Sequence, residues 1–325
     1  MPSLTITPVY TQGGPSTENS DSFFGRYALF ATLAFTATVF LFETYLSLRQ
    51  RSSYFKTEFP SELKTTVSRI DEEEKKSNSA KNDDGAAKPD NSTDAKLDKS
   101  QPLLPQLEAK FSKAQSYGQD KVFFSIVSST YSVIEEIVYL LYGFYPYVWD
   151  AACSIGSKYF GWDESTNEIK VSLIFMAIVT VIGLITQLPF DIYSTFFIEK
   201  KHGFNKQTPK LFVEDKIKGL ALEAVFGGFS LAAILKLIKW GGDKFYIYVW
   251  AFAFAFTTFM MTIAPVFIMP LFNKYDPLPE GELKKQIFDL AGRLKFPLTK
   301  LFVMDGSKRS SHSNAFMFGF FNNKR

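Results

Sequence analysis

The chain has 325 residues and a net charge of +3, too small a positive charge to indicate nucleic-acid binding. Hydrophobic residues make up 46% of it and aromatic residues 17%, with 35 phenylalanines gathered in long runs, which is typical of a membrane protein. The single cysteine, Cys153, excludes a disulfide framework and a cysteine-based metal site, and we expect a small buried apolar residue there.

The first apolar run lies between Arg26 and Arg49 and holds 22 residues whose only charge is Glu43. This length is enough to cross a bilayer, so the sequence predicts a transmembrane helix over residues 23–48. Residues 1–22 lack a basic region, which favours a signal-anchor over a cleaved signal peptide. We therefore expect a short lumenal tail followed by a membrane helix.

Residues 49–120 are predicted to form a cytosolic linker. Its stretch 71–100 holds 15 charged residues and almost no apolar side chain, a composition typical of disorder. It also contains the glycosylation pattern Asn91-Ser92-Thr93.

Four further spans are predicted within residues 121–273. The clearest is 171–190, which has 20 residues without a charge, and the segment 245–273 has 29 uncharged residues. Pro265 and Pro270 indicate where the last helix ends. With the first span, these segments predict an all-α polytopic membrane protein of about five transmembrane helices.

The other two segments, 122–149 and 219–235, carry carboxylates at membrane depth, namely Glu135, Glu136 and Glu223. Carboxylates are costly there unless they face protein or water. They either line a helix-bundle interior or lie near the headgroups, or else they face a wet cavity.

Lysine and arginine side chains gather after the first, third and fifth spans. Because cationic loops stay in the cytosol, we expect a lumenal N-terminus and a cytosolic region after Asn273. The loop after the fourth span, with Lys236, Lys239 and Lys244, fits this less well. On this topology Asn91 is cytosolic and carries no sugar.

Residues 274–325 are predicted to begin a small cytosolic α+β region. Within "PLPEGELKKQIFDLAGRLKFP", the residues Leu283, Ile287, Leu290 and Leu294 share one face of an amphipathic helix that is expected to pack on an apolar surface. The segments "LTKLFVMDG" and "SNAFMFGFF" are predicted to be a short buried strand and a second strand. Two strands alone are marginally stable.

Neither histidine belongs to a recognisable catalytic motif. His202 and His312 are 110 residues apart and neither is followed by glutamate, so no His-Glu-x-x-His zinc helix is present. His202 lies in a cationic loop and is expected to be a solvated or capping residue. The sequence also lacks a Gly-x-Ser-x-Gly elbow and a glycine-rich phosphate loop. No catalytic residue and no metal ligand is therefore assigned.

Three long stretches resemble the CAAX prenyl endopeptidases, integral-membrane zinc metalloproteases of the endoplasmic reticulum. They are "LPFDIYSTFFIEKKHGFNKQT" (188–208), "APVFIMPLFNKYDPLPEGELK" (264–284) and "FPLTKLFVMDGSKRSSHSNAFMFGFFNNKR" (296–325), and "FETYLSLRQ" (42–50) is also similar. The resemblance covers nearly the whole chain apart from the N-terminal tail and residues 71–100.

The resemblance implies a helical membrane body around a water-filled chamber. It implies membrane lipid and farnesylated or geranylgeranylated CAAX proteins as partners, whose last three residues are removed. Some members also cut a prenylated precursor upstream. Zinc is the implied cofactor, but the family's His-Glu-x-x-His helix and later glutamate ligand do not occur in these 325 residues. We therefore expect the chain to be an inactive, incomplete portion of such a protease.

The resemblance also suggests a substrate-binding edge. In such proteases an edge strand beside the metal pairs with the extended substrate backbone. Ser313, Asn314 and Ala315 match that strand, and His312 is expected to assist. The alternative for Asn314 is a turn or strand-edge residue that satisfies local backbone groups.

Two other classes of function stay open. The chain could be a non-catalytic membrane protein that binds lipidated tails or acts as a scaffold. A transporter or channel also places carboxylates in a cavity, but the internal repeat often found in such folds is not visible here.

Overall fold

The computed structural model describes residues 23–79, 101–311 and 315–319, which form two compact units. Of the described residues, the first unit comprises 23–79, 101–147 and 189–202, and the second comprises 148–188, 203–311 and 315–319.

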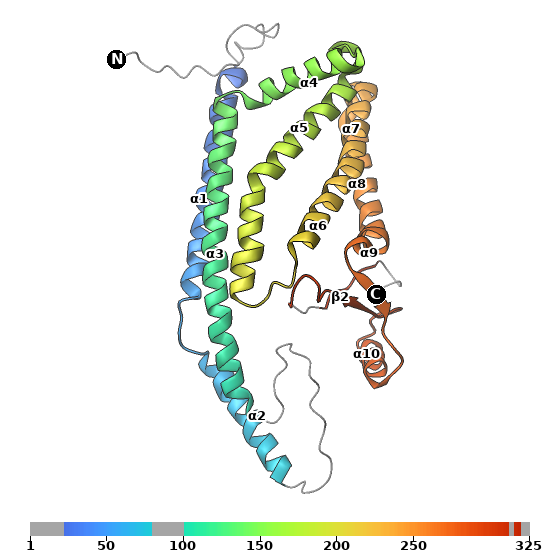
Figure 1. The fold of residues 1–325 in the computed structure, drawn as a ribbon. Coiled ribbons are helices and arrows are strands. Elements are labelled where there is room, and N and C mark those ends of the chain that lie inside the picture. Colours follow the sequence, from blue (N-terminus) through green and yellow to red (C-terminus); the bar gives the residue numbers. More distant parts are fainter. Residues whose placement is uncertain (1–22, 80–100, 312–314, 320–325) are drawn as a thin grey trace, which may run out of the picture. The chain divides into compact units, whose positions relative to one another are not determined.

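Two long helices, α1 (Phe23–Ser53) and α3 (Leu103–Leu141), form the frame of the first unit and lie side by side (Figure 1). Gly118 of α3 is buried, and a Cβ atom at this position would overlap the ring of Tyr54. The absence of a side chain at Gly118 therefore allows the end of α1 to approach α3.

Helix α2 (Ser61–Ser79) packs on α3. The prediction of disorder over 71–100 is therefore wrong for residues 71–79, which are helical. Val67 and Asp71 of α2 are buried, and the Asp71 carboxylate accepts hydrogen bonds from the backbone N–H groups of Leu103 (2.7 Å) and Leu104 (3.0 Å). These contacts stabilise a helix that composition alone does not favour. Residues 80–100 lie outside the described part of the chain.

The segment 122–149, predicted as one span, contains a helix break. Helix α3 ends at Leu141, and α4 (Phe144–Phe160) begins after Gly143, which has φ +70°. Glycine adopts this left-handed conformation without steric cost, so the chain can turn there. The remainder of the first unit includes the π-helix η3 (Ser194–Glu199), which also contacts α3.

The second unit is built mainly of helices. Besides α10, described below, it contains most of α4, the first part of α5 (Glu164–Tyr193), α6 (Pro209–Leu222), η4 (Glu223–Gly227), α7 (Gly228–Gly241), η5 (Gly242–Lys244), α8 (Phe245–Ile263), η6 (Ala264–Ile268) and α9 (Met269–Phe272). The chain reverses at Gly242, whose φ is +52°, so that α7 and α8 pack side by side (Figure 1). Near the predicted proline break, a π-helical turn follows Ile263, and helical structure ends at Phe272.

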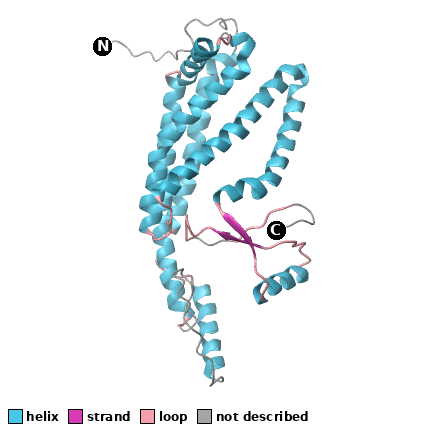
Figure 2. Cartoon of the chain, turned by 45° about the vertical axis from the view of Figure 1, so that its right-hand side comes forward, coloured by secondary structure: helices cyan, strands magenta, loops and turns pink. Residues whose placement is uncertain are grey.

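A two-stranded antiparallel sheet follows the last of these helices (Figure 2). Strand β1 (Lys274–Pro277) pairs with β2 (Phe302–Asp305), with Tyr275 opposite Met304. The prediction of a buried strand is correct in position but wrong in burial, because all four residues of β2 are exposed. The predicted second strand is not found in its described part, residues 315–319.

Helix α10 (Glu282–Arg293) confirms the predicted amphipathic helix but not the packing of its whole apolar face. Ala291 is buried, whereas Leu283, Leu290 and Leu294 are more than half exposed. Two strands of four residues offer little surface for these leucines to cover.

The described chain exposes most of its large apolar side chains. Only seven hydrophobic residues are buried in the described part, whereas Phe35, Trp250 and Phe254 are each more than 65% exposed. Within the described residues, four helical stretches are long and apolar enough to cross a membrane: Tyr27–Ser53, Leu103–Leu141, Glu164–Glu199 and Pro209–Phe272. Such exposure suits lipid rather than water, and the fold is that of a polytopic helical membrane protein with a small strand region.

Candidate functional site

The segment that leads to the predicted substrate-binding residues is held by Arg309. Its Nε and Nη2 atoms donate to Oδ2 and Oδ1 of Asp215 on α6, at 2.8 and 2.7 Å. Two parallel hydrogen bonds between opposite charges are among the strongest polar contacts in proteins. Both side chains are largely buried, and the hydrogen bonds to Asp215 raise the pKa of the Arg309 guanidinium further above its ordinary value.

The same ion pair joins two more segments of the second unit. Arg309 Nη1 donates to Oδ1 of Asn273, which follows α9, at 3.0 Å. Gln207 Nε2 donates to the Asp215 carboxylate at 2.8 Å. We call Arg309, Asp215, Asn273 and Gln207 the Arg309 cluster. The sequence analysis missed it, although three of its members lie in the stretches that carry the family resemblance.

Backbone contacts place residues 203–205 ("GFN") next to residues 309–311 ("RSS"). The N–H of Lys206 donates to the carbonyl oxygen of Arg309 (3.1 Å), and the N–H of Ser311 donates to the carbonyl oxygen of Phe204 (2.9 Å). Asn205 and Ser310 form an antiparallel bridge between these contacts. Residues about a hundred positions apart in the sequence therefore form a strand-like pair that ends at Ser311.

Of the four predicted substrate-binding residues, only Ala315 lies in the described part of the chain. It is exposed and belongs to no strand. His312, Ser313 and Asn314 lie outside the described residues. The structure thus places the residues immediately before this segment, and the prediction for the segment itself stays a prediction.

Of the two expectations for His202, a solvated residue or a capping residue, the structure contradicts the first. Its side chain is 10% exposed, and its Nε2 atom lies 2.8 Å from Oδ2 of Asp120 on α3. Lys201 Nζ is 2.6 Å from the same oxygen. Nearby, Tyr117 donates to Glu199. These contacts make His202 part of a polar network that joins η3 to α3.

The residues of the described chain do not fit zinc. Within the described ranges, no three His, Cys, Asp or Glu side chains come together in a group that could hold a metal ion. Cys153 is half-buried, and burial together with the Glu164 carboxylate raises the pKa of its thiol, which disfavours the thiolate that binds metals. We therefore assign no metal ligand to the described residues.

Each carboxylate predicted at membrane depth accepts a hydrogen bond from a hydroxyl group. Tyr139 donates to Glu135 and Tyr145 to Glu136, both at 2.8 Å. Thr180 donates to Glu223 at 3.1 Å, beside a cavity of about 600 Å³ with mainly apolar walls from α5, α6, η4 and α7. A protein partner lowers the cost of placing a carboxylate in a membrane helix.

Two family models match the chain in succession. Residues 103–274 match the model described as CAAX prenyl protease N-terminal, five membrane helices. Residues 277–325 match the model of peptidase family M48. The second match includes Arg309, α10 and the predicted substrate-binding segment.

Named relatives agree with these models. The chain is 40% identical over 293 residues to the CAAX prenyl protease 1 homolog of Arabidopsis thaliana, covering 90% of this chain and 59% of the relative. It is 37% identical over 298 residues to the human CAAX prenyl protease 1 homolog, covering 91% and 54%. The chain thus spans between half and six tenths of the length of these relatives.

A solved structure shows the same fold. The crystal structure of S. mikatae Ste24p matches with a TM-score of 0.70 and 36% sequence identity. The match covers 91% of this chain and 60% of that one.

Proposed function

The chain belongs to the CAAX prenyl protease family, and we propose on that basis that it supplies the membrane body and the substrate-binding edge of such a protease. The proposed reaction removes the C-terminal tripeptide from farnesylated or geranylgeranylated CAAX proteins. An additional upstream cut in prenylated precursors is part of the same proposal. The proposed setting is the endoplasmic reticulum membrane, with a lumenal N-terminus and a cytosolic C-terminal region.

The observation that supports this proposal most directly is the Arg309 cluster. It holds Ser310 and Ser311 against the Phe204–Asn205 backbone, directly before the four residues proposed to bind substrate. An anchor at this point limits the positions that the next residues can occupy. In the proposal, Asn314 and Ala315 contact the extended substrate backbone by strand addition, with Ser313 beside them and His312 assisting.

Zinc is proposed as the cofactor only because the chain belongs to a metallopeptidase family. In metallopeptidases the ion activates the water that attacks the peptide bond. The 325 residues contain no His-Glu-x-x-His sequence. We therefore propose that the 325-residue polypeptide by itself does not cleave prenylated peptides.

A chimera tests the proposal. Residues 1–325 are joined to the part of the Arabidopsis relative that lies beyond its match to this chain, and cleavage of a farnesylated CAAX peptide is measured. We expect chelator-sensitive cleavage by the chimera and none by the 325-residue chain. Replacing Asn314 with alanine is expected to lower kcat/KM about tenfold, because a hydrogen bond to substrate is lost.

Asn167→Ala serves as the matched control, because Asn167 lies near the start of α5, is partly exposed and is far from residues 312–315 in the sequence. Full activity of the Asn314→Ala chimera would contradict the proposed substrate contact. Chelator-sensitive cleavage by the 325-residue chain would contradict the proposed need for further residues.

A further inference from the structure

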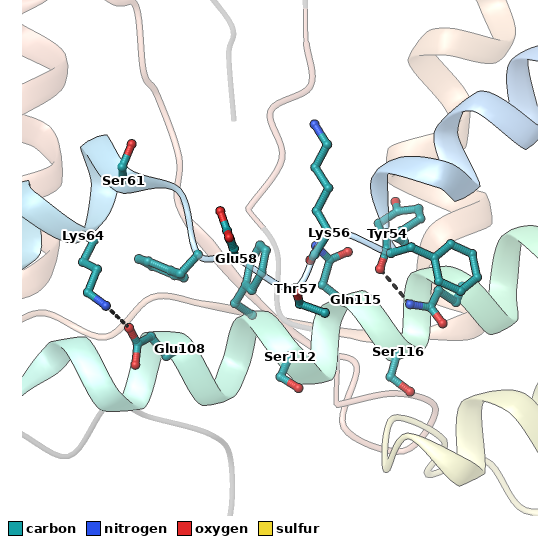
Figure 3. A pocket seen from close by; sticks show the side chains of 14 residues that line it. Tyr54, Lys56, Thr57, Glu58, Ser61, Lys64, Glu108, Ser112, Gln115 and Ser116 are labelled. Carbon is teal, nitrogen blue, oxygen red and sulfur yellow. Dashed lines mark hydrogen bonds and ion pairs between the residues drawn. The ribbon is translucent and has the colours of Figure 1, made fainter.

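A cavity of about 750 Å³ lies where the segment between α1 and α2 crosses α3 (Figure 3). Gln119 Nε2 donates to the Tyr54 carbonyl at 2.7 Å, and Gln115 Nε2 donates to the Lys56 carbonyl at 3.1 Å. These two amide groups tie the crossing segment to α3. All of the lining residues belong to the first unit.

Two further contacts join the walls at the other end of the cavity. The rings of Phe59 and Phe111 meet edge to face, with centroids 5.4 Å apart. Lys64 Nζ lies 3.3 Å from Oε1 of Glu108. The walls are therefore fixed from both sides, by hydrogen bonds at one end and by an aromatic pair and an ion pair at the other.

One buried acceptor in this wall lacks a donor. Oε1 of Gln115 is shielded from solvent and has no hydrogen-bond partner within the described part of the chain. The other amide atom, Nε2, is already engaged by Lys56. A buried polar atom without a partner is unfavourable by about 1–3 kcal/mol. A ligand N–H group would satisfy this oxygen once the Gln115 side chain turns toward the cavity.

The cavity also presents one positive and one negative side chain. Lys56 and Glu58 are exposed, and neither forms an ion pair among the described residues, whereas Lys64 and Glu108 pair with each other. Figure 3 shows Lys56 and Glu58 projecting from the same side of the crossing segment. A simple anion or cation would meet one favourable and one unfavourable charge. A ligand that carries both charges matches this arrangement.

The position of the cavity along α1 indicates the depth of the lipid headgroups. The apolar run of α1 ends before Arg49, the helix itself ends at Ser53, and the cavity begins at Tyr54. The 39 residues of α3 are about 58 Å long at about 1.5 Å per residue, roughly twice the ~30 Å hydrocarbon core. Part of α3 must therefore extend beyond the core.

Aromatic and cationic side chains support the same depth. The Arg51 guanidinium lies over the rings of Phe55 and Phe123, at 5.2 and 5.0 Å from their centroids. Aromatic rings and cations that close a membrane span are typical of the membrane–water interface.

We propose that this cavity binds the headgroup of a zwitterionic phospholipid with a primary ammonium, that is, a phosphoethanolamine lipid. Lys56 pairs with the phosphate, and Glu58 with the ammonium. On binding, the Gln115 side chain turns so that its Oε1 accepts an N–H of the same ammonium. The volume lies within the usual range for ligand sites. The inference needs α1 to span the membrane but does not depend on proteolysis.

Native mass spectrometry of the purified 325-residue protein tests this site. Phosphatidylethanolamine, phosphatidylcholine and phosphatidylglycerol with identical acyl chains are offered at equal concentration. We expect phosphatidylethanolamine to be retained about tenfold better than phosphatidylcholine, because the trimethylated headgroup has no N–H to donate. Glu58→Gln should abolish most of this preference, and Lys56→Gln should weaken retention of both lipids.

Matched variants control for charge. Glu62→Gln on α2 and Lys113→Gln on α3 make the same changes at exposed positions outside the cavity, and both should retain the wild-type preference. A melting curve for each variant checks that it is folded. Equal retention of phosphatidylethanolamine and phosphatidylcholine, strongest retention of phosphatidylglycerol, or an unchanged preference in Glu58→Gln would each overturn the proposal.

A crosslinking experiment gives a second readout on the unmodified chain. A phosphatidylethanolamine with a photoreactive group near its headgroup is incorporated into nanodiscs with the protein, and the labelled peptides are identified. We expect labels within residues 54–61 and 108–119, which contain most of the cavity lining. Labels found only elsewhere would overturn the proposal.

Discussion

The guanidinium of Arg309 contacts two separate segments of the second unit, through Asp215 and Asn273, and Gln207 adds a third by binding the same carboxylate. Its N–H groups donate to oxygen atoms of these partners, and the Arg309 and Asp215 side chains are largely buried, so water competes little for these hydrogen bonds. Removing one member therefore leaves another without its partner. We expect such a change to loosen the backbone that precedes the proposed substrate-binding residues.

Asp215→Asn is expected to loosen this backbone. The change removes the charge from a hydrogen-bonded pair, and hydrogen bonds to charged groups contribute about 1.5–3 kcal/mol. Hydrogen exchange should become faster at the amides of Lys206 and Ser311, which donate across the paired segments. Amide exchange measured by mass spectrometry on the 325-residue protein would report this directly.

The neighbouring Glu214→Gln is the control for this prediction. Glu214 is about half exposed and lies 3.9 Å from Lys210, so its loss should leave exchange at Ser311 unchanged. Unchanged exchange in the Asp215→Asn protein would show that the ion pair does not hold the segment.

At the scale of secondary-structure elements, α1, α2 and α3 depend on contacts that bring distant residues together. Asp71 of α2 caps the first turn of α3 from outside that helix, where the free N–H groups of a helix need acceptors. Gly118 lets Tyr54 lie against α3. Local propensity does not account for either contact, so the packing of these elements is sensitive to single changes.

Gly118→Ala is expected to lower the melting temperature of the protein. The new methyl group would overlap the Tyr54 ring, and overpacking of this kind costs about 1–3 kcal/mol, which outweighs the gain of about 1 kcal/mol from a better helix former. Thermal unfolding in detergent, followed by tryptophan fluorescence, would measure the shift.

Gly183→Ala provides the opposite expectation on α5. Apart from the local helix backbone, no heavy atom of the described residues lies within 4 Å of a Cβ atom built at Gly183, so this variant should be neutral or more stable. A double variant with Tyr54→Ala should recover part of the loss caused by Gly118→Ala. If Gly118→Ala raised the melting temperature as Gly183→Ala does, the proposed close approach of Tyr54 would be wrong.

At the scale of the whole molecule, the proposed orientation follows from the charges of the loops. Clusters of lysine and arginine after alternate spans favour a lumenal N-terminus and a cytosolic C-terminal region. The natural sequon at Asn91 then lies on the side of the membrane where no sugar is added. The orientation can be tested on the intact chain.

Thr5→Asn creates an Asn-Ile-Thr sequon in the N-terminal tail. When the chain is expressed in eukaryotic cells, we expect this variant to gain one N-linked sugar, seen as a gel shift that a glycosidase removes. The unmodified chain should show no shift. A glycosidase-sensitive shift of the unmodified chain that disappears in Asn91→Gln would reverse the proposed topology.

Much of the helical architecture follows from properties that neighbouring residues carry by themselves. The absence of charge over residues 171–190 and 245–263 predicts membrane helices, because the length and polarity of a span are local quantities. The 3.6-residue period of Leu283 and Ile287 likewise predicts α10. The sequence strings that resemble the family can likewise be recognised from neighbouring residues alone.

Tertiary structure decided which distant residues become partners. Asp71 binds backbone groups 32 residues away, His202 lies beside a carboxylate 82 residues away, and Arg309 pairs with Asp215 across 94 residues. A side chain's own neighbours in the sequence do not indicate such a partner, because burial arises only when separate elements pack. For this reason the sequence suggested disorder at Asp71 and a solvated or capping role at His202, whereas the folded chain shields both side chains from solvent.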